Sequence, residues 1–172
     1  MRIDTELRGE SEDMDKEQLI QEIKTAFKDV TLEDGIGINE ADSIEMGERD
    51  SVINTARNQD RSWWKEWTDI EDKYISSYSS VMDFMDSKGI KWVLPAYMTY
   101  IIKHYKEGSF SIDSTIYILE EGAMGSDKLD LYTPEQKKVI AEFLQFMITV
   151  GEERLDVASA QAALDKIWIQ YL

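Results

Sequence analysis

The segment Gly89-Ile90-Lys91-Trp92-Val93-Leu94-Pro95-Ala96-Tyr97-Met98-Thr99-Tyr100 carries the strongest structural signal in this sequence. A short apolar run reaches a proline, and apolar residues at helical spacing begin directly after it. Proline suits the first turn of a helix, because its missing N–H would have no helical partner there. The apolar positions then cover most of the helix circumference, which is typical of an element at the centre of a fold. We therefore expect a deeply buried helix that begins at Pro95 and ends near Glu107.

Four further long helices are expected from apolar periodicity and from helix-start signals. Thr133-Pro134-Glu135-Gln136 combines a hydroxyl cap, a proline in the first turn and a glutamine three residues after the cap. Thr68-Asp69-Ile70-Glu71 reads as a capping box that opens another helix, and Gly89 would end that helix in the left-handed conformation. The helix that Thr133 opens is expected to extend to residue 150, and the other two helices are expected over residues 15–30 and 156–171.

The segments between these helices give weaker signals. In residues 31–47 the glycines break any long helix, and Asn39 is expected to cap a short one that ends near Gly47. Residues 48–62 are polar and predict a weak helix or a loop. Residues 111–120 have helical spacing, yet their β-branched content also permits a strand, and both alternatives stay open. Residues 121–131 read as a loop.

These elements predict a mainly α fold: a single compact orthogonal helical domain of five main helices plus short elements. The domain is expected to cover residues 15–172 and to follow a flexible acidic N-terminal tail, residues 1–14. With 172 residues the chain is long enough to bury a substantial core. The sequence contains no internal repeat and no linker that would separate two domains.

The charge balance limits the classes of partner. Nineteen Lys and Arg residues oppose 35 Asp and Glu residues, so the net charge is −16. Such a field repels nucleic acids and anionic membranes and attracts basic proteins, although acidity can also serve solubility alone. We expect no nucleic-acid partner and no membrane partner. The sequence has no cysteine, no apolar region of a signal peptide in residues 1–13, and no apolar run long enough to span a bilayer, so we expect a cytoplasmic protein.

The chain lacks a recognisable catalytic, cofactor or metal motif. His104 is the single histidine and lies in the apolar Pro95 helix, which favours a core or boundary role over catalysis. The acidic pairs Glu120-Glu121 and Glu152-Glu153, and Asp127 with Asp130, are what chance predicts in a chain this acidic. The loop Gly122-Ala123-Met124-Gly125-Ser126 lacks the strand, helix and lysine of a phosphate-binding loop. We therefore expect no catalytic residues, no cofactor and no bound metal.

Trp63, Trp64 and Trp67 are the candidate binding residues. At helical spacing they would share one face, where they would either fill the core or form an exposed contact surface. Tryptophan is over-represented among residues that dominate binding energy, and three within five positions exceed what packing requires. We expect at least one ring to be substantially exposed, and Trp63 or Trp64 rather than Trp67, because Trp67 directly precedes the capping box.

The sequence resembles the DUF6714 family of small, mostly bacterial proteins of unknown function. The resemblance rests on the passages Gly35-Ile36-Gly37-Ile38-Asn39-Glu40-Ala41 after a helix with Ala26-Phe27, Trp67 with Ile70, Phe84 through Met98, and Leu131-Tyr132-Thr133-Pro134-Glu135-Gln136 with Phe143-Leu144 and Trp168. It covers roughly residues 15–171, and Leu-Pro-Ala-Tyr at its centre is its most distinctive part. Trp92-Val93 departs from the aromatic pair expected before Leu-Pro. The resemblance implies a fold and no activity.

Three functional hypotheses follow. The first is a non-enzymatic acidic protein-binding module, of which an immunity-type inhibitor of a basic toxin is one form. The second is a hydrolase that uses carboxylates around the Pro95 helix, and the third is a structural subunit of an assembly. The sequence does not determine the oligomeric state, so we leave it open.

Overall fold

The computed structural model describes residues 15–120, 128–151 and 156–172. Over these ranges every regular element is helical and no strand occurs, which confirms the mainly α fold. Residues 111–120 are therefore helix. The expected tail, residues 1–14, and the loop Gly122–Ser126 lie outside the described residues. The principal helices are residues 15–26, α2 (Ile38–Glu45), α3 (Asp50–Trp63), α4 (Asp72–Ser77), α5 (Ser87–His104), α6 (Phe110–Glu120), α8 (Pro134–Val150) and α9 (Val157–Ala163).

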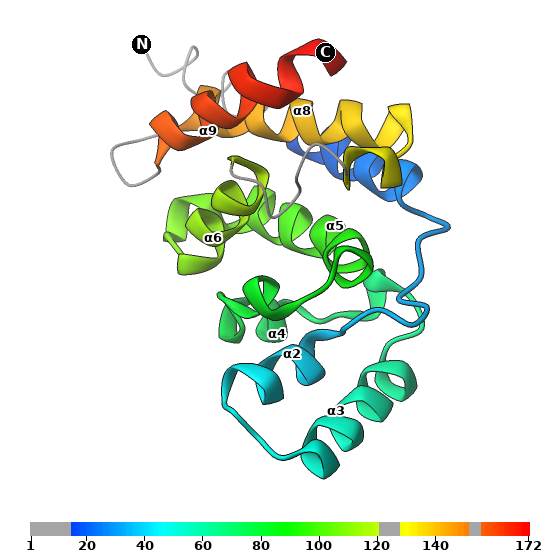
Figure 1. The fold of residues 1–172 in the computed structure, drawn as a ribbon. Helices are drawn as coiled ribbons and strands as arrows, with labels where there is room; N and C mark the ends of the chain where they lie inside the picture. Colours follow the sequence, from blue (N-terminus) through cyan, green and yellow to red (C-terminus); the bar gives the residue numbers. More distant parts are fainter. Residues whose placement is uncertain (1–14, 121–127, 152–155) are drawn as a thin grey trace.

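The helices form three levels in Figure 1. Helix 15–26, α8 and α9 lie at the top, α5 and α6 occupy the middle, and α2 with α3 lies at the bottom. A single buried apolar cluster extends through these levels, from Leu19 to Trp168. No described helix has the length and apolar composition that crossing a membrane requires.

Helix α5 is the central element, but it does not begin at Pro95. It begins at Ser87, continues without a break through Gly89 and Pro95, and buries 13 of its 18 residues. An interior proline removes a helical hydrogen bond and costs about 3 kcal/mol. Burial of nearly the whole middle of the helix offsets this cost, because helices in proteins owe most of their stability to packing. The expectation that Gly89 ends a helix was therefore wrong.

Asp86 provides the start of α5 that the sequence analysis missed. Its carboxylate accepts a hydrogen bond from the Gly89 N–H at 2.9 Å, as an N-cap side chain does. The same oxygen accepts the Ile36 N–H at 3.0 Å. Gly89 lies so close to the loop that an added Cβ would overlap the Ile36 carbonyl, and a Cβ on Gly35 would lie 2.8 Å from the Gly89 nitrogen. Both glycines are thus needed for close backbone approach.

The long helix expected after Thr68 is also absent. Three short elements replace it: the 3-10 turn η1 (Trp67–Asp69), α4, and the 3-10 turn η2 (Val81–Phe84). The capping box is shifted by two residues, because it pairs Glu66 with Asp69. Serines at 76, 77, 79 and 80 weaken helix formation by offering alternative hydrogen bonds to the backbone. Ile75 of α4 and Met82 of η2 are both buried.

The other helix boundaries follow the expectations more closely. Thr133 and Gln136 form the expected reciprocal cap of α8, with bonds of 3.2 and 3.1 Å. The first helix ends at residue 26 rather than 30. Residues 48–62, for which a weak helix or a loop was expected, contain all but the last residue of α3. After α9 the chain continues through the π-helical turn η5 (Leu164–Trp168) and the 3-10 turn η6 (Ile169–Tyr171). The expected five main helices therefore give way to more and shorter elements.

Candidate binding surface

The three candidate tryptophans do not share a helix face. Trp63 is the last residue of α3, Trp64 has an extended backbone, and Trp67 opens η1. Trp63 is 50% exposed, whereas Trp64 and Trp67 are buried. At least one ring is therefore exposed, as expected, and it is one of the two that the sequence favoured. The end of α3 separates the rings, so the expectation of a common face was wrong.

Trp63 rests on a stack of aromatic rings that leads into the core. It contacts Trp64 edge-on, with ring centroids 5.9 Å apart, and Tyr74 at 6.4 Å. Trp64 contacts Tyr74 at 4.9 Å and the fully buried Trp92 at 6.4 Å. Tyr78 stacks parallel to Tyr74 at 6.3 Å. Such contacts hold each ring in a defined position, so Trp63 presents a rigid exposed edge. The two tyrosines were missed because the sequence pattern placed them inside a continuous helix.

Trp67 has a structural role. Its indole N–H donates to the Phe27 carbonyl at 3.0 Å and thereby ties the end of the first helix to η1. The ring is buried in the same cluster as Phe27. Of the three candidates, Trp64 supports the Trp63 ring, Trp67 packs in the core, and Trp63 is the one with an exposed ring.

Two buried carboxylates, Glu40 of α2 and Asp60 of α3, lie between these helices. Asp60 precedes Trp63 by three residues. Asp60 of α3 accepts the backbone N–H groups of Asn39 and Glu40 at 2.9 and 3.0 Å. It also accepts the Asn39 side-chain amide at 3.0 Å. Glu40 is paired with the Arg57 guanidinium at 2.5 Å and lies 3.9 Å from Arg61. Sequence reasoning missed this cluster; its only signal was Gly37, which cannot cap α2 with a side chain.

Two carboxylates in one buried site are typical of catalytic acids, so their access to solvent decides their role. Burial raises the pKa of Asp60 from 3.8 to about 6, against the lowering effect of its hydrogen bonds from Glu40 and Asn39. Both side chains are inaccessible, with exposures of 0% and 1%. A substrate cannot reach either carboxylate in this arrangement. The cluster therefore holds α2 against α3 through hydrogen bonds and an ion pair.

His104 lies at the boundary of the core, where its ring bridges two carboxylates. Nδ1 is 3.0 Å from Glu107 and Nε2 is 3.2 Å from Asp72 of α4. These contacts, with Glu107 the stronger, raise the pKa of His104. The ring also packs on Tyr100 at 4.6 Å. Within the described ranges, no group of three or more His, Asp or Glu side chains is placed to hold a metal ion.

An open groove of about 730 Å³ runs between helix 15–26 and α8. Its floor includes Ala26 and Val139, and its rim carries charges of both signs, including Glu22, Lys138 and Glu142. Lys138 and Glu142 already pair with each other at 2.9 Å. Its lining holds four carboxylates against two lysines, so the groove is acidic like the chain as a whole.

Comparisons with known proteins bear on the family and not on the function. A model of a family of unknown function, DUF6714, matches residues 15–172, which is most of the chain. Neither a curated protein nor a solved structure matches the chain. Two glycines of the family passages lie at close contacts in the structure. Gly35 packs against Gly89, and Gly37 packs against Asp60. The chain belongs to the DUF6714 family.

Proposed function

We propose that this protein is a non-enzymatic, acidic protein-binding module that uses Trp63 as a contact residue and recognises a basic protein. The observation that carries the proposal is the half-exposed Trp63 ring held on a rigid aromatic base. A pre-positioned aromatic side chain loses little conformational entropy on binding, which is why tryptophan dominates many interfaces. The net charge of −16 favours a partner of opposite charge.

The hydrolase hypothesis receives less support. Helix α5, around which the carboxylates were expected to act, is enclosed in the core from Ile90 to Ile102. The buried carboxylates Glu40 and Asp60 are engaged in contacts between helices. An immunity-type inhibitor remains the specific form of the module that the charge favours, and a toxin-like gene adjacent to this one would support it. A cytoplasmic location belongs to the same proposal.

Capture of partners with matched variants tests the proposal. Tagged wild type, Trp63→Ser and the control Leu131→Ser serve as baits in a lysate of the native host, with quantitative mass spectrometry as the readout. Leu131 is comparably exposed, at 42%, and lies beside Lys88 on the rim of a different hollow. We expect wild type and Leu131→Ser to enrich the same basic protein to an equal extent. Trp63→Ser should enrich that protein at least ~10-fold less. Equal enrichment by all three baits, or an acidic partner, would contradict the proposal.

A further inference from the structure

We infer that a second surface of this protein docks a segment of its basic partner that has apolar residues in its centre and Lys or Arg at both ends. This surface, called the apolar row below, consists of Met46, Phe84, Phe110 and Tyr117. The inference rests on the proposed function for the sign of the partner's charge. It goes beyond that proposal because it names a separate surface and the pattern of residues that would fit it.

The four side chains are unusually exposed for their size. Phe110 is 82% exposed, Met46 71% and Tyr117 53%, while Phe84 is exposed to a smaller extent. Leaving a phenylalanine in water instead of burying it forgoes about 1.5–3 kcal/mol. A single exposed apolar residue is ordinary, whereas several from adjacent elements mark interaction sites.

The elements that carry the row pack against one another. Turn η2, which ends at Phe84, contacts both α2 and α6. The Ser80 hydroxyl next to η2 donates to Glu45 at 3.0 Å, one residue before Met46. Phe110 and Tyr117 lie seven residues apart on α6, which places them on the same helix face about 10 Å apart. The row therefore extends from the end of α2 across η2 and along α6.

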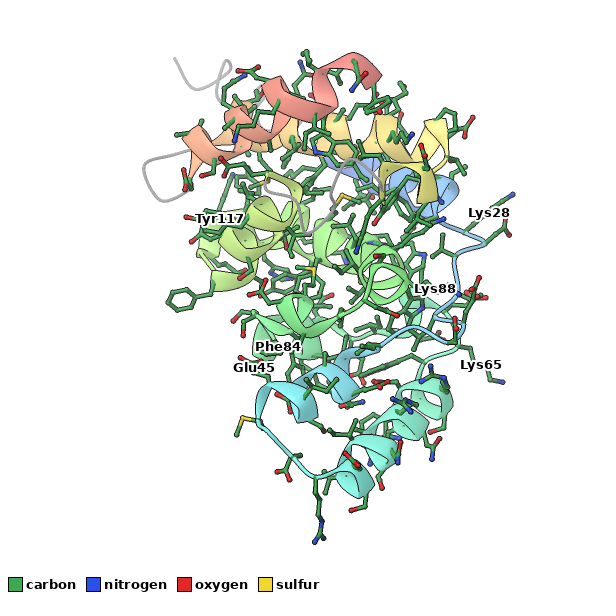
Figure 2. The ribbon with its side chains drawn as sticks, in the orientation of Figure 1. Lys28, Glu45, Lys65, Phe84, Lys88 and Tyr117 are labelled. Carbon is green, nitrogen blue, oxygen red and sulfur yellow. The ribbon has the colours of Figure 1, made fainter. Side chains whose placement is uncertain are left out.

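Figure 2 shows the row's position relative to the charges. Glu45, Phe84 and Tyr117 lie along one edge of the molecule in this view, and Lys28, Lys65 and Lys88 lie along the opposite edge. The labelled residues of the row therefore lie near a carboxylate and away from the labelled lysines, of which Lys88 is itself paired with Glu33 and Asp34. A positively charged segment would approach the edge that carries the row.

Carboxylates for which the described residues provide no Lys or Arg ion-pair partner occur at both ends of the row. At one end of the row lie Asp42 and Glu45 of α2. The pKa of Asp42 is raised, mainly by burial and then by the nearby charge of Glu45. At the other end Asp156 accepts a hydrogen bond from the Tyr117 hydroxyl at 3.4 Å. Asp113 lies on the same face of α6 between Phe110 and Tyr117, and burial, followed by the charge of Asp156, raises its pKa.

Among the described residues, no Lys or Arg forms an ion pair with any of these four carboxylates. Two negative ends around an apolar centre therefore define the complementary partner.

Other occupants fit the surface less well. A second copy docked about a two-fold axis would place acidic ends against acidic ends, which costs energy through like-charge repulsion. Anionic lipids and nucleic acids would meet the same repulsion. A basic segment satisfies both the apolar centre and the carboxylates.

The inference is tested with a defined peptide. The probe is a fluorescein-labelled synthetic peptide with a leucine-rich centre and a lysine block at each end. Its control has the same composition with the lysines in the centre. Fluorescence polarisation at physiological salt measures binding to wild type, Phe110→Ser, and the matched control Leu131→Ser. Because Phe110 is so exposed, the serine variant should keep the fold, and far-UV circular dichroism checks this.

We expect the leucine-centred peptide to bind wild type and Leu131→Ser equally and Phe110→Ser ~10-fold more weakly. Asp113→Asn should also weaken binding, whereas Asp130→Asn beside Leu131 should not. Equal binding of both peptides, unchanged binding by Phe110→Ser, or no binding to wild type would overturn the inference. A wild-type dimer in sedimentation that Phe110→Ser abolishes would overturn it in favour of a second copy.

The two proposals fail separately. Trp63→Ser should bind the peptide like wild type, because Trp63 lies outside the row, and should lose only the partner captured from the host. Loss of peptide binding in Phe110→Ser with unchanged host capture by Trp63→Ser would retain the apolar row and reject the role of Trp63.

Discussion

Asp60 supplies the cap that the N-terminus of α2 lacks. Gly37 occupies the N-cap position and has no side chain, so the first N–H groups of α2 need another acceptor. Asp60 reaches them from α3, about 20 residues further along the chain. An added Cβ on Gly37 would lie 2.5 Å from the Asp60 carboxylate, which explains the glycine. Asn39, expected as the cap, instead donates to Asp60 from inside the first turn.

The raised pKa of Asp60 makes a pH-dependent contribution to stability. Because its pKa is about 6 in the folded state and 3.8 ordinarily, the native protein binds this proton more tightly than the unfolded chain. The contribution is therefore fully present below about pH 4 and is lost as the pH rises through about 6. We expect the free energy of unfolding of wild type, minus that of Asp60→Asn, to fall across this window. Urea unfolding at several pH values measures the difference.

Asp130→Asn is the control for this experiment, because Asp130 is exposed. The free energy of unfolding of wild type, minus that of Asp130→Asn, should not fall across the same pH window. A difference for Asp60→Asn that stays constant, or that grows with pH, would show that burial does not dominate the titration of Asp60.

At the scale of elements, α5 and the loop before α2 form the central contact of the fold. The Asp86 carboxylate joins them by accepting N–H groups from both. The Tyr97 hydroxyl donates to the Tyr78 carbonyl and links the same helix to the chain after α4. Helix α5 thus organises the loop that positions α2 as well as the core around it.

Gly89→Ala distinguishes close packing from helix propensity. In an open helix alanine would stabilise this position by about 1 kcal/mol relative to glycine. Here the added methyl group would overlap the Ile36 carbonyl, which is backbone and cannot move aside easily. We expect a loss of about 1–3 kcal/mol or more, measured by chemical denaturation. Gly47→Ala is the control, because Gly47 has a positive φ and no neighbour within 4 Å, so only backbone strain of about 1–2 kcal/mol applies. A gain in stability for Gly89→Ala would refute the close-approach explanation.

Ile101→Ala tests the central position of α5. Ile101 is fully buried, so its truncation leaves a cavity in the core. We expect a loss of about 2–5 kcal/mol in the free energy of unfolding. The same substitution at the exposed Ile169 should have a much smaller effect. A loss under about 1 kcal/mol at Ile101 would match an ordinary surface change and contradict the central role of the helix.

At the scale of the whole molecule, the labelled lysines and the labelled residues of the apolar row lie on opposite edges in Figure 2. The net charge is −16, yet Lys28, Lys65 and Lys88 gather along one edge in Figure 2. Glu45, and Phe84 and Tyr117 of the apolar row, lie along the other. A partner attracted by the overall field would therefore be oriented by this asymmetry.

The association rate with a basic partner should depend on salt. As ionic strength rises through the physiological value, where the Debye length is about 8 Å, screening weakens the long-range attraction. We expect the association rate constant to fall with added salt while the dissociation rate constant changes less, as stopped-flow fluorescence can measure. Association kinetics that do not respond to salt would indicate that the acidity serves only solubility.

The sequence by itself determined the helical class, the reciprocal cap of α8, the burial of α5 and the exposure of one tryptophan. These properties depend on residues within a few positions of each other, so local periodicity and caps reveal them. The expectation failed wherever a distant contact decided the outcome. Trp63, Trp64 and Trp67 were assigned to one helix face because nothing nearby indicates that α3 ends between them.

Only the tertiary structure decided that α5 continues through Gly89 and Pro95. Read locally, a glycine after Ser87-Lys88 and a proline after an apolar run are a helix end and a helix start. In the folded protein the glycine is required by a loop about 50 residues earlier, and the proline is tolerated because the core encloses it. The energies of these distant contacts exceed local propensities, and a pattern of neighbouring residues carries no record of them.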